Sequence, residues 1–233
     1  MEKIKAPKKT VNNVFRKNFY EKTTWEANNV ICGIDEVGRG CLAGPLVTAA
    51  VILPLYKHHN LLKDSKSLTQ KELLQAHRWV TRHCKYSLGI VSNNEVDKFN
   101  IWQSTLIAMK KALLHLLAIS DQKPSSILVD AMPLKLCHTA YSNIPVYHFT
   151  KGESKSTSIA AASIVAKVER DRIMGKLDAV FPGYQLRNHK GYGTKKHKNA
   201  VKKQKHTIIH RVSFLNKSFI DRDYDNQEQL TLC

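Results

Sequence analysis

Five short apolar runs along the chain have the length and the content of Val, Ile and Leu that are typical of buried β-strands. They cover residues 31–34, 46–53, 86–91, 126–130 and 145–150. A glycine-rich turn separates the first two runs, whereas longer segments separate the later ones. The pattern predicts an early pair of connected strands, followed by strands that helices separate.

Three longer segments carry apolar residues at helical spacing and cover residues 69–84, 100–119 and 156–180. The first begins with a capping box, because Thr69 and Glu72 have the required spacing, and Leu68 and Leu73 could form the accompanying hydrophobic staple. Strands that alternate with helices predict an α/β fold with a mixed sheet. We find no internal repeat and no low-complexity linker that would divide the chain.

Composition narrows the possible partners. The chain has 233 residues, and 42% of them are hydrophobic, which supports a well-buried core and excludes disorder over most of the length. Lys and Arg number 37 against 19 Asp and Glu, so the formal net charge is +18. This excess favours a polyanion as partner, although ribosomal-type and membrane-surface proteins can be equally basic.

The cellular setting follows from what the sequence lacks. No apolar run is long enough to span a bilayer, and the charged start of the chain has no apolar stretch of a signal peptide behind it. The five cysteines are scattered and form no C-x-x-C pair. We therefore expect a cytoplasmic protein with reduced thiols, without a zinc site and without a membrane partner.

The positive charge is unevenly distributed. Residues 185–211 contain nine Lys or Arg and no acid, with Tyr184 and Tyr192 nearby, a mixture that suits a surface following a nucleic-acid backbone. The first thirty residues are also basic, and the last segment is polar and partly acidic. We expect a basic N-terminal extension over residues 1–28, one folded domain over residues 29–216 and a polar C-terminal tail over residues 217–233.

Acidic residues stand where two of the apolar runs end. Asp35 and Glu36 follow the first run directly, and Asp130 ends the fourth. Two adjacent carboxylates repel each other, so a divalent metal ion that neutralises them would explain the pair, although an Asp can also simply cap a turn. Strand ends meet at one rim of an α/β sheet, so Asp35 and Asp130 are expected to share a site. Strand alternation would point Glu36 to the opposite side, unless a turn or bulge redirects it.

Two further acids are weaker candidates. Glu153 precedes the helix expected from residue 156, where it could serve the helix dipole or act as a further metal ligand. Asp171 lies among Glu169, Arg170 and Arg172, which we interpret as a charged helix face. Oxygen ligands without clustered Cys or His select hard ions. Two Mg²⁺ or Mn²⁺ ions about 4 Å apart would suit phosphodiester hydrolysis, and a cationic surface around such a site is what a nuclease needs.

Together, these residues resemble those of bacterial ribonuclease HII, a type 2 ribonuclease H, over most of the chain. The motifs that carry the resemblance are, in chain order, Gly-Ile-Asp-Glu-Val-Gly-Arg-Gly at residues 33–40, Leu-Ala-Gly-Pro at 42–45, Asp-Ser-Lys at 64–66, Val-Asp at 129–130, Lys-Gly at 151–152, Ala-Ala-Ala-Ser-Ile-Val-Ala-Lys-Val at 160–168, Arg-Asp at 170–171 and His-Lys-Gly-Tyr-Gly-Thr at 189–194. The resemblance implies an RNase H-like fold, with a central five-stranded mixed sheet flanked by helices and with C-terminal helices. It also implies Mg²⁺- or Mn²⁺-dependent cleavage of RNA in RNA–DNA hybrids and of the bond 5′ of ribonucleotides in duplex DNA, leaving 5′-phosphate and 3′-hydroxyl ends.

The same resemblance implies roles for individual residues. The acidic site of the family falls on Asp35, Glu36, Asp130 and Glu153, where the last position is usually Asp. The turn that contacts the ribose 2′-hydroxyl falls on Gly38, Arg39 and Gly40, and the tyrosine that senses the RNA–DNA junction falls on Tyr192, which could otherwise simply pack its loop. Cys41 stands where the family often has proline. Phosphate contacts are expected from Lys66, Lys155 and Lys190, with Arg187 as a further candidate.

Three alternatives remain at this point. Ribonuclease HIII shares the fold and chemistry but typically carries a sizeable N-terminal domain, for which about thirty residues leave too little chain. A noncatalytic nucleic-acid-binding module would not need acids at strand ends. An integrase-like nuclease would not show the Gly-Arg-Gly turn together with the Tyr192 loop. We expect a monomer without an obligate protein partner.

Overall fold

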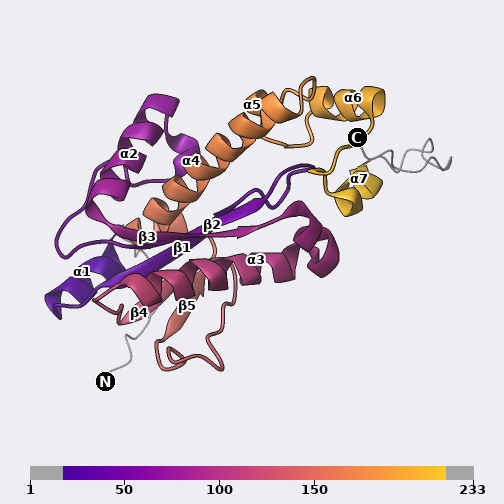
Figure 1. The fold of residues 1–233 in the computed structure, drawn as a ribbon. Helices are drawn as coiled ribbons and strands as arrows, with labels where there is room; N and C mark the ends of the chain where they lie inside the picture. Colours follow the sequence, from indigo (N-terminus) through magenta and orange to yellow (C-terminus); the bar gives the residue numbers. More distant parts are fainter. Residues whose placement is uncertain (1–17, 219–233) are drawn as a thin grey trace, which may run out of the picture.

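The structure, a computed structural model, describes residues 18–218, and five strands form its single mixed sheet (Figure 1). The strands are β1 (Ile31–Val37), β2 (Leu46–Ile52), β3 (Lys85–Val91), β4 (Ser126–Asp130) and β5 (Val146–Phe149). Their order is β3-β2-β1-β4-β5, in which β1, β2 and β3 pair antiparallel and β1, β4 and β5 pair parallel. The five expected strands and the mixed sheet are therefore confirmed.

Three long helices cover the two faces of this sheet. Helices α2 (Gln70–His83) and α4 (Thr157–Val180) lie on one face, and α3 (Asn93–Ile119) lies on the other (Figure 1). Thr69 and Glu72 form the predicted capping box of α2. Helix α3 begins seven residues before the expected start at residue 100. The reason is local, because Asn100 has a left-handed backbone (φ 60°) and its Oδ1 accepts from the amides of Trp102 and Gln103, as an N-cap would.

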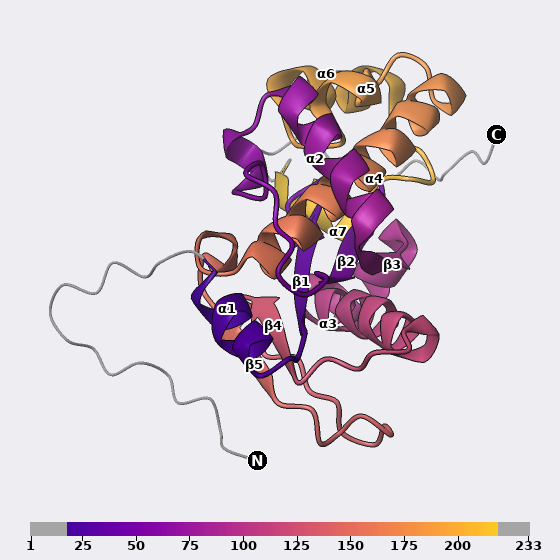
Figure 2. The ribbon, with the colours of Figure 1, turned by 90° about the vertical axis from the view of Figure 1, so that its left-hand side faces the viewer.

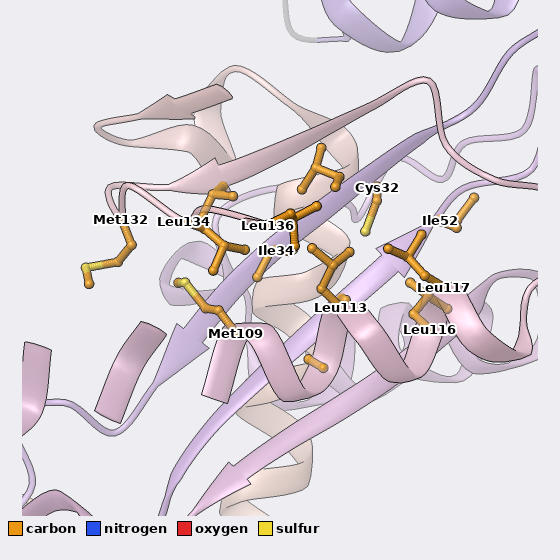
Figure 3. Close-up of a cluster of buried hydrophobic side chains, with 14 of the residues drawn as sticks. Cys32, Ile34, Ile52, Met109, Leu113, Leu116, Leu117, Met132, Leu134 and Leu136 are labelled. Carbon is orange, nitrogen blue, oxygen red and sulfur yellow. The ribbon is translucent and has the colours of Figure 1, made fainter. Parts of the chain in front are cut away.

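The core lies on both sides of the sheet. One cluster of buried side chains fills the space between α3 and the sheet and includes Ile34, Met109 and Leu113 (Figure 3). A second cluster lies under α2 and α4. Helix α4 approaches β1 so closely that a Cβ at Gly33 would lie 2.1 Å from the carbonyl carbon of Ser158. The small residues at the start of α4 permit this contact, which holds the helix against the strand that carries Asp35.

The expected N-terminal extension is partly folded, which corrects the sequence interpretation. Helix α1 (Phe19–Glu26) lies beside the sheet (Figure 2), and the side chains of Tyr20, Glu21 and Trp25 are buried. Oε1 of Glu21 accepts from the hydroxyl of Ser156 at 2.5 Å and from the amide of Ser158 at 2.9 Å. The folded part therefore begins at least ten residues before the expected boundary at residue 29, while residues 1–17 lie outside the described part.

Three short helices, α5 (Leu186–His189), α6 (Lys195–Gln204) and α7 (Val212–Ser218), gather at one end of the molecule (Figure 1). They pack around Leu42, Met174 and Leu186 in a separate cluster of buried side chains. The C-terminal helices implied by the resemblance are thus present. Helix α7 extends two residues into the expected tail, whose remaining residues, 219–233, lie outside the described part. None of the helices in residues 18–218 is long and apolar enough to cross a membrane.

Candidate active site

Asp35 and Asp130 lie side by side at the ends of adjacent strands. In the parallel pair of β1 and β4, Ile34 is opposite Val129, and continuing this register by one residue places Asp130 beside Asp35. Asp35 is opposite Ala49, whose side chain packs under α2 and α4, so the Asp35 carboxylate faces α4. The side chain is 6% exposed. The structure therefore brings together the two acids that the sequence predicted to share a site.

Glu36 leaves the strand toward the other face of the sheet, but at the strand end its carboxylate still lies close enough to Asp130 for the Asp130 charge to raise the pKa of Glu36. Strand β1 continues regularly to Val37, and Glu36 is opposite Thr48, whose hydroxyl bonds the carbonyl of Gly89 on the α3 side. Oε1 of Glu36 accepts from Nη1 of Arg39 at 3.4 Å. The alternation expected from the strand period thus holds, without a bulge that would redirect Glu36.

Glu153 follows a backbone contact to Asp130. It belongs to a 3₁₀ turn (Gly152–Ser154) after β5, and the amide of Gly152 donates to Oδ1 of Asp130 at 2.6 Å. A Cβ at Gly152 would lie 3.1 Å from that oxygen and 2.7 Å from Cδ1 of Ile159, so glycine allows the turn to fit between Asp130 and α4. The turn therefore positions Asp130 and carries Glu153 beside it.

Burial and mutual repulsion disfavour the charged form of these acids. Loss of hydration is the main cause that raises the pKa of Asp35, and the nearby Glu36 and Asp130 raise it further. The pKa of Glu36 is raised to about 7, again mainly by burial, while Arg39 acts in the opposite direction. A bound cation would reverse both effects, because it stabilises the carboxylate form.

Unpaired carboxylate oxygens are a second feature of these acids that suits a cation. Within the described residues, Oε2 of Glu36 and Oε2 of Glu153 are buried and have no hydrogen-bond partner. However, no group of three or more His, Cys, Asp or Glu side chains in residues 18–218 is arranged to hold a metal ion. Mg²⁺ commonly takes only one or two carboxylates and completes its shell with water and substrate phosphate. The residues present fit such open sites.

Ser163 is a site residue that the sequence analysis missed. This α4 side chain lies close enough to Asp35 to lower the pKa of Asp35, which favours its charged form, and the Ser163 hydroxyl lies 3.0 Å from that of Ser65. Ser65 belongs to the Asp-Ser-Lys motif, where Oδ1 of Asp64 accepts from the amide of Lys66 at 2.9 Å. Ser163 thus connects this motif to Asp35, and its place in the small-residue run of α4 was the available signal.

The Gly-Arg-Gly turn directly follows β1 and packs against Arg170. Gly38 has a φ of 97°, and a Cβ there would lie 2.3 Å from Nε of Arg170. Arg170 is 0% exposed and donates to the carbonyls of Pro45, Lys190 and Ala43 at 2.9, 2.8 and 3.2 Å. The interpretation of this segment as a charged outer face is therefore wrong for Arg170. Asp171 pairs with Lys167 at 2.9 Å, as a structural role would require, but its side chain is only 14% exposed.

Tyr192 lies beside the same turn. The backbone of Tyr192 forms an isolated bridge with Cys41, and the Arg170 guanidinium lies 5.9 Å from the Tyr192 ring centre. The Tyr192 side chain is 39% exposed. Arg211, also buried, donates to the carbonyls of Arg39 at 3.0 Å and of Gly44 at 2.9 Å. Two buried arginines therefore join the Gly-Arg-Gly turn, the segment that follows it and the loop before Tyr192.

The expected phosphate-binding cations lie on three different segments. Lys66 is exposed in its 3₁₀ turn (Ser65–Ser67), and Nζ of Lys155 lies 5.5 Å from the ring centre of Phe149. Lys190 is partly exposed, and its carbonyl is one of the groups that bind Arg170. Arg187 pairs with Asp178 at 3.5 Å, which makes it a weaker candidate for a phosphate.

Comparison with known proteins identifies the family. The family model for ribonuclease HII matches residues 32–217. The chain belongs to the ribonuclease HII family. Ribonuclease HII of Lactobacillus gasseri is 41% identical over 219 residues, which are 91% of this chain and 82% of the relative. This family consists of ribonucleases H, so the chain is an endoribonuclease that acts on RNA–DNA hybrids.

Solved structures confirm the RNase H-like fold. RNase HII of Archaeoglobus fulgidus, solved in a complex with PCNA, matches with a TM-score of 0.64 and 24% identity over 87% of this chain and 98% of that one. Bst-RNase HIII, solved in complex with Mn²⁺, matches with a TM-score of 0.61 and 19% identity over 82% of this chain and 69% of that one. At these identities the likeness supports the fold alone.

Proposed function

We propose that this ribonuclease HII cleaves the RNA of hybrids and also nicks duplex DNA on the 5′ side of embedded ribonucleotides, leaving 5′-phosphate and 3′-hydroxyl ends. One observation carries the proposal. Asp35 and Asp130 lie at the ends of the adjacent strands β1 and β4, β1 leads directly into the Gly-Arg-Gly turn, and Cys41 after that turn pairs with the exposed Tyr192. The acids that would support phosphodiester cleavage thus lie next to residues that would recognise the ribose.

We propose Asp35, Glu36, Asp130 and Glu153 as the residues that hold divalent metal ions, Mg²⁺ or Mn²⁺. Support comes from the buried carboxylate pair and from the unpaired oxygens of Glu36 and Glu153 within the described residues. Carboxylate oxygens prefer hard ions of this kind. When bound, such ions activate a water molecule and stabilise the charge that develops on the attacked phosphate. Metal dependence is a property of the family, and the choice between the two metals belongs to this proposal.

The protein itself would recognise the ribose through backbone at close range. At Gly40 a Cβ would meet no atom within 4 Å, so this side of the turn is open to a ligand. Backbone amides and carbonyls of Gly38, Arg39 and Gly40 can then contact the 2′-hydroxyl, the group that separates RNA from DNA. Tyr192 would stack on the sugar of the following deoxynucleotide. Lys66, Lys155 and Lys190 would bind flanking phosphates.

A nicking assay tests this function. A DNA duplex with one ribonucleotide is incubated with Mg²⁺ or Mn²⁺ and with EDTA, beside an all-DNA duplex of the same sequence. We expect one metal-dependent nick on the 5′ side of the ribonucleotide and an intact all-DNA duplex. Equal cutting of both duplexes would refute ribonucleotide recognition.

Variants connect that activity to the carboxylate pair. Asp35→Asn and Asp130→Asn should reduce nicking by at least about 100-fold, because each removes a charge that would face metal, while duplex binding persists. Asp121→Asn is the matched control, since Asp121 is exposed before the start of β4, at the other end of that strand from Asp130. Normal turnover by either site variant would remove that residue from the metal site.

The remaining parts of the proposal concern context. The match to the ribonuclease HII model favours this function over a ribonuclease HIII type, and the strand-end acids favour it over a noncatalytic module. We propose a monomer that needs no protein partner and works in the cytoplasm. The four cysteines in the described residues are free thiols, which is consistent with a reducing compartment.

A further inference from the structure

Three histidines, His189, His197 and His210, lie close together next to the loop that carries Tyr192. The rings of His189 and His197 stack with their centres 4.3 Å apart and an angle of 17° between their planes, and the ring of His210 lies 5.3 Å from that of His197. His197 and His210 are buried. The acid site described above does not use these side chains, yet Nδ1 of His197 lies 3.0 Å from the carbonyl oxygen of Tyr192.

The hydrogen bonds of His210 and His197 form a series in which each donor and each acceptor is fixed. The amide of Thr207 donates to Nδ1 of His210 at 3.0 Å, so this nitrogen carries no proton and Nε2 of His210 does. Nε2 of His210 lies 3.1 Å from Nε2 of His197, which must therefore accept. His197 then carries its proton on Nδ1, which donates to the carbonyl of Tyr192 at 3.0 Å.

This series of hydrogen bonds requires both rings to be neutral, and burial keeps them neutral. Loss of hydration lowers the pKa of His197 to about 4 and that of His210 to about 3, so neither ring is charged at neutral pH. A proton added to His197 would place two N–H groups opposite each other at the 3.1 Å contact, and one added to His210 would place an N–H opposite the amide of Thr207. The tautomers are therefore fixed by the fold.

The same segment also holds the Gly-Arg-Gly turn. Arg211, the residue after His210, donates to the carbonyl of Arg39 at 3.0 Å. His210 hydrogen-bonds His197, which in turn donates to the carbonyl of Tyr192. Two consecutive residues thus connect the two parts of the proposed ribonucleotide site, the turn that faces the ribose and the tyrosine that faces the next sugar.

We infer that His197 and His210 are positioning residues that set Tyr192 relative to the Gly-Arg-Gly turn and thereby set the preference for a ribonucleotide followed by a deoxynucleotide. The inference rests on the proposed role of Tyr192. Cleavage inside a long RNA strand has no such junction at most bonds, so it depends less on this alignment. The histidines should therefore change the ratio of the two activities rather than both activities alike.

Two amide variants of His197 separate the contacts of the chain. In His197→Gln, the amide oxygen can lie where Nε2 was, so it can accept from His210, but the Tyr192 carbonyl loses its donor. In His197→Asn, the amide nitrogen can lie where Nδ1 was, so it keeps the donor to Tyr192 and loses His210. Both variants replace a buried ring with a smaller polar group, so their general effects on folding are similar. His115→Gln, at an exposed position of α3, is the control.

The experiment measures kcat/KM on a duplex with one ribonucleotide and on an all-RNA hybrid, with the full chain and saturating Mn²⁺. We expect His197→Gln to lower the ratio of the first value to the second about 5-fold, the effect of one lost hydrogen bond, mainly through kcat. His197→Asn should keep most of the ratio measured for the unchanged protein, and His115→Gln should not change the ratio. Tyr192→Ala, measured beside them, should lower the ratio at least as much as His197→Gln.

The outcomes distinguish the inference from the function on which it rests. If Tyr192→Ala leaves the ratio unchanged, the proposed role of Tyr192 fails. If Tyr192→Ala lowers the ratio but His197→Gln lowers both activities equally, the histidines only support folding and this inference is overturned. Equal ratios for the Gln and Asn variants would likewise overturn it, because the donor to Tyr192 would then not matter.

Discussion

The buried histidine His210 makes a quantitative prediction about stability in acid. Its pKa is lowered to about 3, first by burial and then by the neighbouring His197 and His206, with His189 also facing it. In the unfolded chain a histidine has a pKa of about 6.5. Between these values the unfolded chain binds a proton that the folded protein does not, so stability is fully present above pH 6.5 and falls as the pH falls.

The magnitude follows from the unfolded state. At pH 5 the solution is about 1.5 units below the unfolded pKa, and each unit corresponds to about 1.4 kcal/mol, so His210 should cost about 2 kcal/mol of the free energy of unfolding. This value of about 2 kcal/mol holds as long as the pKa of His210 in the folded protein stays well below 5. Asp35 and Glu36 act with the opposite sign, because their raised pKa values make the folded protein bind protons first. The contribution of His210 must therefore be measured as a difference between two proteins.

Urea unfolding at pH 7 and pH 5, in EDTA so that no metal ion binds the acids, gives that difference. The loss of unfolding free energy between the two pH values should be about 2 kcal/mol smaller in His210→Gln than in the unchanged protein. His115→Gln, which removes an exposed histidine, should lose as much as the unchanged protein. If His210→Gln and the unchanged protein lose the same free energy, His210 is not held as a buried neutral ring, and the hydrogen-bond chain to Tyr192 is wrong.

Three further predictions concern the site and its supporting helix. Gly38→Ala should lower nicking activity about 10-fold or more and reduce the free energy of unfolding in urea by about 1–3 kcal/mol. The added Cβ would lie 2.3 Å from Nε of Arg170, at a φ of 97°, so normal activity and stability would mean that the turn can shift. Glu153→Asp should keep more nicking activity than Glu153→Gln, because a carboxylate is needed whatever its length, and equal activity of the two variants would argue against a metal ligand. Gly175→Ala, in the middle of α4 where a Cβ meets no atom within 4 Å, should raise the unfolding free energy by about 0.5–1 kcal/mol without changing activity, and a loss of stability would contradict the open space there.

Local patterns were sufficient for the sheet and for most of the acid site. Strand period and length predicted five strands whose ends match the structure to within three residues, and Asp35 and Asp130 were expected to meet because both end a strand. The position of Glu36 on the opposite face also follows from the strand period. These features depend on residues close together in the chain, which is why sequence reasoning reached them.

The failures have physical reasons. Arg170 was read as exposed because its neighbours in α4 are charged, but its three acceptors belong to segments up to 127 residues away that no helical period reveals. The basic first thirty residues predict an extension that includes helix α1, yet Glu21 is held by Ser156 and Ser158, more than 130 residues later. Burial of a charged group depends on partners that only the folded chain supplies.

By itself, the sequence determined which acids stand at strand ends and that a polyanion is the expected partner, and its resemblance to ribonuclease HII implied which turn would contact a ribose. The tertiary structure decided how these parts are held, through Ser163 on Asp35, Arg170 and Arg211 on the Gly-Arg-Gly turn, and His197 on the Tyr192 carbonyl. The difference is one of range. Strand and turn signals act over a few residues, whereas hydrogen bonds such as that from Arg211 to Arg39, 172 residues apart, exist only after the chain has folded.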